Sequence, residues 1–126
     1  MLEPTGQRRI DVAYLAGLVD GEGCFLFNGG PHLRVESTSR CVIEKMHEVF
    51  GGSCAVAKRK TALNRIVFMW SAYGPTASSI AEELAEFLID KRIQAILMSR
   101  IQKYPPGSAM RESIKIRLKS IKKAAS

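Results

Sequence analysis

Residues 15–23 read LAGLVDGEG. It continues an apolar run from Val12 and then ends in two carboxylates, Asp20 and Glu22, each followed by a glycine. From Asp11, a plausible helix N-cap, the run to Val19 has the length of a helix and almost no polar face. A helix that is apolar nearly all round must be covered on two sides.

The chain's own sheet can supply one cover for this helix, and the other cover has two candidates. The first is a second copy of the same helix, because the small residues Ala13, Ala16 and Gly17 recur at helical spacing and would let two backbones approach closely. The second is the remaining core of a monomer. We expect a dimer interface at Ala13, Ala16 and Gly17.

The composition favours a polyanionic partner. The chain has 126 residues, a formal net charge of +7 and a pI near 9.6. This length suits one domain, here residues 1–126 with a basic C-terminal helix or tail over 105–126. Nucleic acid and an acidic membrane surface are the two partners that such a charge suits.

Cysteine usage and the N-terminus indicate the compartment. Cys24, Cys41 and Cys54 match neither a zinc pattern nor a disulfide framework, so we expect small, reduced core residues. Residues 1–11 lack the apolar stretch of a signal peptide, and no apolar run reaches the roughly 20 residues that cross a bilayer. We expect a soluble, intracellular protein of cytoplasm, nucleoid or organelle matrix, without membrane contact.

Hydrophobic periodicity predicts an α+β fold. After the first helix, strands are expected at 24–27, 32–38, 53–60 and 65–73, with inward residues at alternate positions. Helices are expected at 39–50, 77–88, 90–103 and 110–123, separated by glycine and proline signals. Two hairpins with helices packed on one face form an antiparallel sheet whose other face is open.

The open face collects polar and basic residues. A twisted antiparallel ribbon can enter the DNA major groove and read base edges with alternate side chains. The alternative is a solvated outer face, and the basic residues after 110 likewise either touch phosphates or form the wet side of a helix. Candidate DNA-binding residues are Asn28, His32, Arg34, Lys58, Arg59, Lys60 and Arg65.

Few residues are arranged for chemistry. Neither histidine has a nucleophile in the setting of a catalytic triad, and no phosphate-binding glycine loop occurs, so we expect no nucleotide cofactor. Glu22 and Asp20 remain, and a carboxylate at a fraying helix end can hold a hard cation with help from the Gly21 carbonyl. The alternative is that they only solvate the helix end, although negative charge there opposes the helix dipole. Two helices about a twofold axis would pair two Glu22 side chains.

The stretch LAGLVDGEG resembles the signature of the LAGLIDADG homing endonucleases, which implies an αββαββα order. Residues 35–38, before a helix that ends at 50–52, look like the family's second strand and helix. Residues 88–95 resemble the segment that carries its active-site lysine. The resemblance spans about residues 10–103, and the tail from Pro105 matches nothing.

The resemblance assigns roles to individual residues. Glu22 would be the metal-binding acid for Mg²⁺ or Mn²⁺, with Gly21 adding a carbonyl, and Lys91 would stabilise charge near the scissile phosphate. Asp20 would be more structural than catalytic, and Arg40 would be a basic helper. Glu36 stands where the family often has a polar residue, frequently Gln, so it would act as a base or repel the phosphate.

Only one signature is present, which in this family implies a homodimer. The expected function is a site-specific double-strand DNA endonuclease, typically intron-encoded on a mobile genetic element, that cuts a long pseudo-palindromic target to short 3′ overhangs. Two alternatives remain. One is a non-cleaving splicing maturase or DNA-binding regulator on the same scaffold, and the other is a basic structural dimer.

Overall fold

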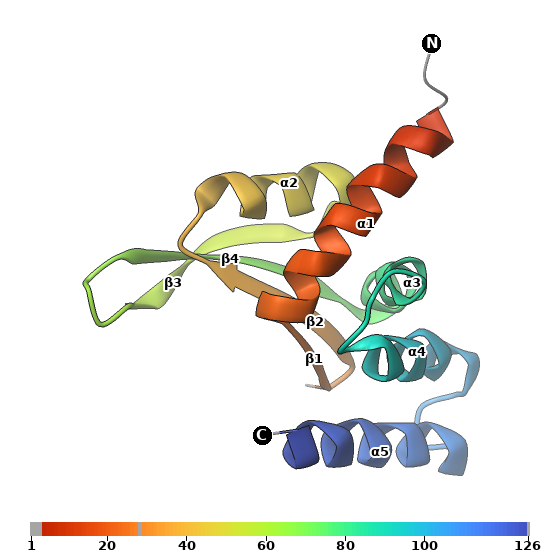
Figure 1. Ribbon diagram of the computed structural model, residues 1–126. Coiled ribbons are helices and arrows are strands. Elements are labelled where there is room, and N and C mark those ends of the chain that lie inside the picture. The colour runs from red at the N-terminus through yellow and green to blue at the C-terminus, as the bar shows by residue number, and fades with distance from the viewer. Residues whose placement is uncertain (1–3, 28, 126) are drawn as a thin grey trace.

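The computed structural model describes residues 4–27 and 29–125. These residues form a four-stranded antiparallel sheet with helices against one face (Figure 1). The α+β class and the repeated order of helix and two strands, expected from sequence, are confirmed. The elements are α1 (Pro4–Glu22), β1 (Gly23–Phe27), β2 (Pro31–Ser37), α2 (Arg40–Phe50), β3 (Ser53–Lys60), β4 (Ile66–Tyr73), α3 (Gly74–Ala85), α4 (Arg92–Arg100), the short 3₁₀ helix η1 (Ile101–Lys103) and α5 (Ala109–Ala125).

The strand order β1-β2-β4-β3 places the two hairpins side by side. Phe25, Leu33 and Ala72 form one inward row across three strands, and all three are buried. Trp70 lies in the next row, and its indole Nε1 donates a hydrogen bond to the Gly51 carbonyl at 2.7 Å. Alternate strand residues therefore define an inner face under the helices and an outer face on the other side.

Helix α1 begins at Pro4, so the expected N-cap at Asp11 is wrong. The added turns are held by α3: Arg8 forms a bidentate pair with Glu83 at 2.7 and 2.8 Å, and Arg9 pairs likewise with Glu86. Such planar pairs fix geometry as well as charge. Asp11 lies inside the helix, where its carboxylate accepts a hydrogen bond from the Gln7 amide.

One side of α1 is covered and the other is exposed. Val12, Leu15, Ala16 and Val19 are buried in the core. The opposite side carries Ile10, Ala13, Tyr14, Gly17 and Gly21, all exposed. The expected small-residue face is therefore corrected at Ala16, which packs inside its own chain, whereas Ala13 and Gly17 stay available.

The last glycine of LAGLVDGEG is needed for the turn into β1. A Cβ at Gly23 would lie 2.7 Å from the Val19 carbonyl oxygen and from a Val19 methyl carbon, closer than real contacts allow. At Gly17 and Gly21 a Cβ would meet nothing within 4 Å. Gly23 thus serves this chain's own packing, while the other two leave an open helix surface.

Several boundaries differ from expectation for local reasons. Helix α3 begins at Gly74 with Pro75 in its first turn. Proline is tolerated there because the first backbone N–H groups of a helix have no partner within the helix. Helix α4 starts only at Arg92 and passes into η1 at 101. Alternation along 65–73 predicts Ile66 on the inner face with Phe68 and Trp70, but Ile66 is exposed beside an irregularity in the β3–β4 register.

The cysteines are free, but they are not core residues. Cys41 and Cys54 are exposed and Cys24 is half-buried. Cys24 lies on the outer sheet face, where the Lys122 ammonium of α5 reaches its Sγ at 3.2 Å. No helix within the described ranges is long and apolar enough to cross a membrane.

Helix α5 follows the free edge of the sheet. Ile114 and Leu118 bury its apolar stripe in the core, and the helix packs along α4 and β1. The Lys115 ammonium lies 5.3 Å from the centre of the Phe27 ring, a cation–π distance. Helix α5 thus runs beside β1 (Figure 1), and its Lys115 and Lys122 side chains reach residues of that strand.

Candidate functional site

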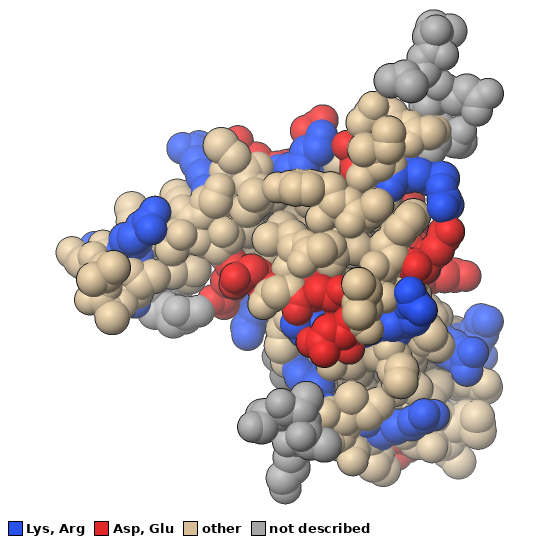
Figure 2. All heavy atoms as spheres, viewed as in Figure 1, with Lys and Arg blue, Asp and Glu red and all other residues tan. Residues whose placement is uncertain are grey.

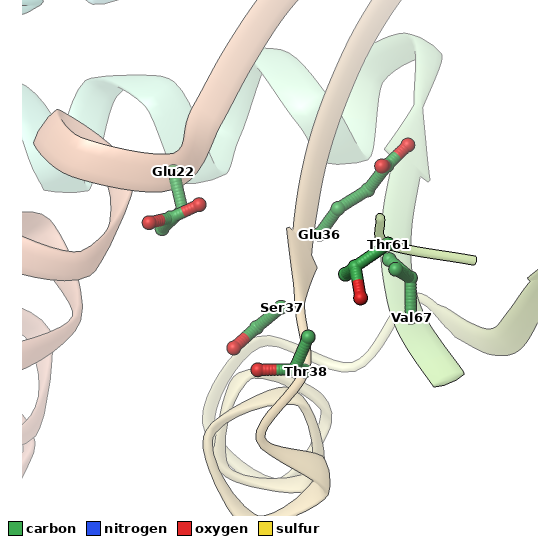
Figure 3. Close-up of a pocket in the computed structure, with 6 residues that line it drawn as sticks. All are labelled: Glu22, Glu36, Ser37, Thr38, Thr61 and Val67. Atoms are coloured by element: carbon green, nitrogen blue, oxygen red, sulfur yellow. The ribbon is translucent and has the colours of Figure 1, made fainter. Parts of the chain in front are cut away.

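A polar pocket of about 300 Å³ lies where α1 ends over strands β2 and β4. Figure 3 shows Glu22 at the end of α1, across from Ser37 and Thr38, with Glu36 and Thr61 further along the same opening. Val67 is the one apolar side chain that lines it. The pocket therefore offers carboxylate and hydroxyl oxygens, the donor set that a hard divalent cation prefers.

The two carboxylates of the pocket differ in exposure. Glu22 is exposed, whereas the Glu36 side chain is only 21% exposed. Glu36 lies on the outer face of β2 and its Oε1 is 3.5 Å from Nε of Arg34, two residues earlier on the same face. Arg34 thus offsets one of the two negative charges, and Glu22 projects freely into the opening.

Asp20 does not enter the pocket. Its Oδ2 accepts a hydrogen bond from the Ile89 amide at 2.8 Å, and its Oδ1 accepts one from the Lys91 amide at 2.9 Å. These amides precede α4, so the carboxylate satisfies donors at a helix start, as an N-cap side chain does. The expectation that acids at the end of α1 lack a local stability reason is therefore wrong for Asp20.

The environment of Asp20 favours its charged form. Partial burial raises the pKa of this carboxyl, but backbone hydrogen bonds from Ile89, Lys91 and Asp90 and the charge of Lys91 outweigh burial. The net result is a pKa below the ordinary aspartate value. Asp20 is therefore held as a carboxylate, and it fixes the segment before α4 outside the pocket.

Lys91 is tied to the same helix end. Its Nζ donates a hydrogen bond to the Asp20 carbonyl oxygen at 2.6 Å, while its amide bonds to the Asp20 carboxylate. The carbonyls at the end of a helix carry partial negative charge, which suits an ammonium. Lys91 is thus anchored on the end of α1, the helix that also carries Glu22, and its place in a shared site stays a prediction.

Arg40 and Gly21 lie at the margins. Arg40 opens α2, where its Nε pairs with Glu44 at 2.8 Å. It lines a separate groove with Cys54, Val56 and Phe68 on the inner side of the sheet, so the structure does not bring it to the Glu22 pocket. Gly21 is exposed on α1 beside Glu22.

The residues present fit a divalent cation only in part. Within residues 4–27 and 29–125 no group of three or more His, Cys, Asp or Glu side chains is close enough to hold a metal. The oxygen-rich pocket supplies one exposed carboxylate and hydroxyl groups, which is suitable chemistry for Mg²⁺ or Mn²⁺. Further ligands would come from a second chain or a phosphate.

The outer sheet face and the projecting hairpin are the candidate nucleic-acid interface. Figure 2 shows Lys and Arg side chains on the projecting β3–β4 hairpin, acidic side chains around the end of α1, and a hollow between the hairpin and the α5 lobe. Lys60 and Arg65 are exposed near the hairpin tip, and Arg34 is half-buried. Asn28 lies outside the described residues, and for Lys58 and Arg59 only the backbone, in β3, is described.

His32 is not available as a direct contact. It lies on the outer face as predicted, but it is only 5% exposed. Burial, with a smaller contribution from the charge of Arg34, lowers the pKa of His32 below its ordinary value. The ring is therefore neutral at neutral pH, and its role must differ from that of a phosphate-binding cation.

Sequence reasoning missed some residues of the site. Ser37, Thr38 and Thr61 line the pocket with Glu22 and Glu36, and Tyr73 lies exposed on the outer face over His32. Alternation along β2 and β4 places Tyr73 on the same face as His32, so the pattern could have indicated it. Thr61, which follows β3, lines the pocket because of how the β3–β4 hairpin is placed, and no pattern in the local sequence indicates this position.

Comparison with solved structures identifies the architecture. I-CvuI bound to its target in 2 mM Ca superposes with a TM-score of 0.65 and 20% identity, covering 87% of this chain and 83% of that one. I-CvuI in complex with the I-CreI target, with the DNA not cleaved in 2 mM Mg, superposes with a TM-score of 0.63 and 23% identity. This match covers 89% of this chain and 77% of that one. This chain has the homing-endonuclease fold.

A third structure agrees with this result. The archaeal intron-encoded homing endonuclease I-Vdi141I, complexed with DNA, gives a TM-score of 0.64 and 16% identity over 88% of this chain and 83% of that one. No family model and no curated protein matches the sequence. The resemblance to the LAGLIDADG homing endonucleases is thereby confirmed at the level of the fold.

Proposed function

We propose that this chain is a metal-dependent, site-specific endonuclease that cuts double-stranded DNA as a homodimer. The observation that carries the proposal is the position of the oxygen-lined pocket. Glu22 and Glu36 share it at the end of α1, the helix whose opposite side is apolar and exposed. A homing-endonuclease fold with this pocket favours phosphodiester hydrolysis over binding alone.

Dimerisation through α1 would complete the site. The exposed residues Ile10, Ala13, Tyr14 and Gly17 form a face on which small residues allow close approach of a second α1. About a twofold axis, the same patch meets itself, and the two Glu22 carboxylates come near each other at one end. Two sites related in this way suit a long pseudo-palindromic duplex cut on both strands, leaving short 3′ overhangs.

The residues proposed for the site would have distinct roles. Glu22 would hold Mg²⁺ or Mn²⁺, with the Gly21 carbonyl as a further oxygen ligand. A cation held there would supply activation of water and stabilisation of the leaving oxygen. Lys91, anchored on the Asp20 carbonyl, adds positive charge near the scissile phosphate, and Asp20 positions Lys91.

Assays of DNA cleavage and DNA binding, with wild type and the Glu22→Gln variant, test this proposal. The substrate is the protein's own coding locus without its intervening sequence, incubated with and without Mg²⁺. Glu22→Gln should abolish cleavage and leave duplex binding within about twofold, while Glu82→Gln, an exposed glutamate of α3, should cut as wild type. Loss of binding together with residual cutting would reject the metal role of Glu22.

The alternative is a binding protein on the same scaffold, a splicing maturase or DNA-binding regulator that does not cut. One observation favours it: a second carboxylate, Glu36, lines the pocket and would repel a phosphate. Wild-type chain that binds the locus but never cuts it, while Glu36→Gln cuts, would support this reading. If Glu36 assists the metal, Glu36→Gln should instead raise the Mg²⁺ concentration for half-maximal cleavage several-fold.

A further inference from the structure

A stacked pair of rings occupies the outer face of the sheet, away from the Glu22 pocket. His32 of β2 pairs with Tyr73 of β4, and their ring centres lie 4.2 Å apart at an interplanar angle of 16°. His32 is 5% exposed and Tyr73 is 59% exposed. The histidine is therefore the buried support and the tyrosine is the accessible partner.

The polar atoms of His32 are held below the surface. Its Nε2 lies 3.3 Å from the Ser71 hydroxyl, and within the described residues its buried Nδ1 has no hydrogen-bond partner. Buried polar atoms are paired in the great majority of cases, so retaining such a ring needs an explanation. Its stacking on Tyr73 supplies one, because the support fixes the orientation of an otherwise mobile exposed side chain.

We propose that Tyr73 is a specificity-determining residue that reads a base edge, and that His32 is its positioning residue. This rests on the proposed function. The phenol offers one donor for a major-groove acceptor, such as N7 of a purine or O4 of thymine. A ring already held by stacking loses little conformational freedom when it binds, which favours recognition.

The position along β2 separates this pair from the Glu22 pocket. His32 and Glu36 are four residues apart on one strand face. At about 3.3 Å per strand residue, their separation is roughly 13 Å. In the proposed dimer, Tyr73 would therefore meet a base pair away from the scissile phosphate, at one symmetry-related position in each half-site.

The test compares recognition profiles of full-length chains. Wild type and Tyr73→Phe are each used to select duplexes from a randomised pool in metal-free buffer. Tyr73→Phe keeps the stack and removes only the hydroxyl. It should lose about 3- to 10-fold discrimination at one symmetry-related position per half-site, the value of one hydrogen bond. Tyr104→Phe, the same change outside the sheet, should leave the profile unchanged.

A second variant tests the support. His32→Ala removes the stack, and it should broaden the same position as Tyr73→Phe while circular dichroism shows an intact fold. A Tyr73→Phe profile identical to wild type would overturn the inference. If Tyr73→Phe instead weakened binding equally to all DNA sequences and lowered the slope of log K against log salt, the inference would also be overturned. Tyr73 would then contact a phosphate. A wild-type chain without any sequence preference would contradict the proposed function itself.

Discussion

Asp20 and Lys91 hold each other through two hydrogen bonds, and a third from Ile89 to Asp20 helps them join the end of α1 to the segment before α4. The Asp20 carboxylate accepts from the amides of Ile89 and Lys91, and the Asp20 carbonyl accepts from the Lys91 ammonium at 2.6 Å. The segment before α4 has no regular structure of its own from 88 to 91. Its conformation therefore depends on a side chain nearly 70 residues earlier in the sequence.

Replacing Asp20 should destabilise the fold in a graded way. Asp20→Ala leaves two backbone amides without their acceptor, which should lower the free energy of unfolding by about 1–3 kcal/mol. Asp20→Asn keeps one acceptor oxygen and should lose less. Urea unfolding measures both, with Asp90→Ala as the control on an exposed neighbour. Equal stability of Asp20→Ala and wild type would show that the segment is held by other contacts.

The free energy of unfolding should decrease as pH is lowered, because of His32. Burial lowers the pKa of this histidine in the folded chain, so the unfolded chain binds its proton more readily. The contribution is fully present above about pH 6.5 and is lost as pH falls through the folded pKa. The groups facing the ring are Arg34, Ser71 and Tyr73, of which Arg34 strengthens the effect.

The measurement is urea unfolding at pH 7.5 and pH 5. His32→Phe, which keeps a stacking ring, should lose less stability between these pH values than wild type. Each unit by which the pKa is lowered contributes about 1.4 kcal/mol once pH is below both values. Gln102→Ala, a change at an exposed residue that does not titrate, should leave the slope unaltered. The same slope in wild type and His32→Phe would contradict this account.

The fold was largely predictable because its signals are local. Alternating apolar residues gave strands β2 and β4 almost to the residue, and glycines at 51 and 52 marked the end of α2. The start of α1 was not predictable. Its first turns are polar, and what holds them is the ion pairs of Arg8 and Arg9 with a helix more than 70 residues away.

Two short segments that resemble the family, 15–23 and 88–95, singled out Glu22 and Lys91, and their roles stay predictions. The structure ties both residues to the end of α1. The burial of His32 was hidden, because alternation shows which face a residue takes and not whether a neighbour covers it. Tyr73 provides that cover, and its partner was fixed only by the β2–β4 register.

A bulky residue at Gly17 should separate the proposed dimer without harming the chain itself. A Cβ there meets nothing within 4 Å, and glycine is a poor helix former, so Gly17→Leu should be neutral or stabilising for the isolated fold. In the dimer the same side chain would hold the two α1 helices apart. Sedimentation should then show a monomer, and cleavage of both strands should be lost.

The control for Gly17→Leu is Ile116→Glu, a change on the exposed face of α5. It should stay dimeric. A Gly17→Leu chain that remains dimeric would move the interface away from α1. Wild type that is monomeric on DNA would contradict a twofold site altogether.

Two basic margins should bind phosphates along the hollow between the hairpin and α5. Lys60 lies at the hairpin end of β3, and Lys119 lines a cavity with Leu26 beside β1. Each phosphate contact releases counterions, so Lys60→Ala or Lys119→Ala should lower the slope of log K against log salt by roughly one. Lys103→Ala on η1 should not change the slope. If Lys119→Ala behaves like Lys103→Ala while Lys60→Ala does not, the basic side of α5 is only a solvated helix face, and the duplex is held by the hairpin alone.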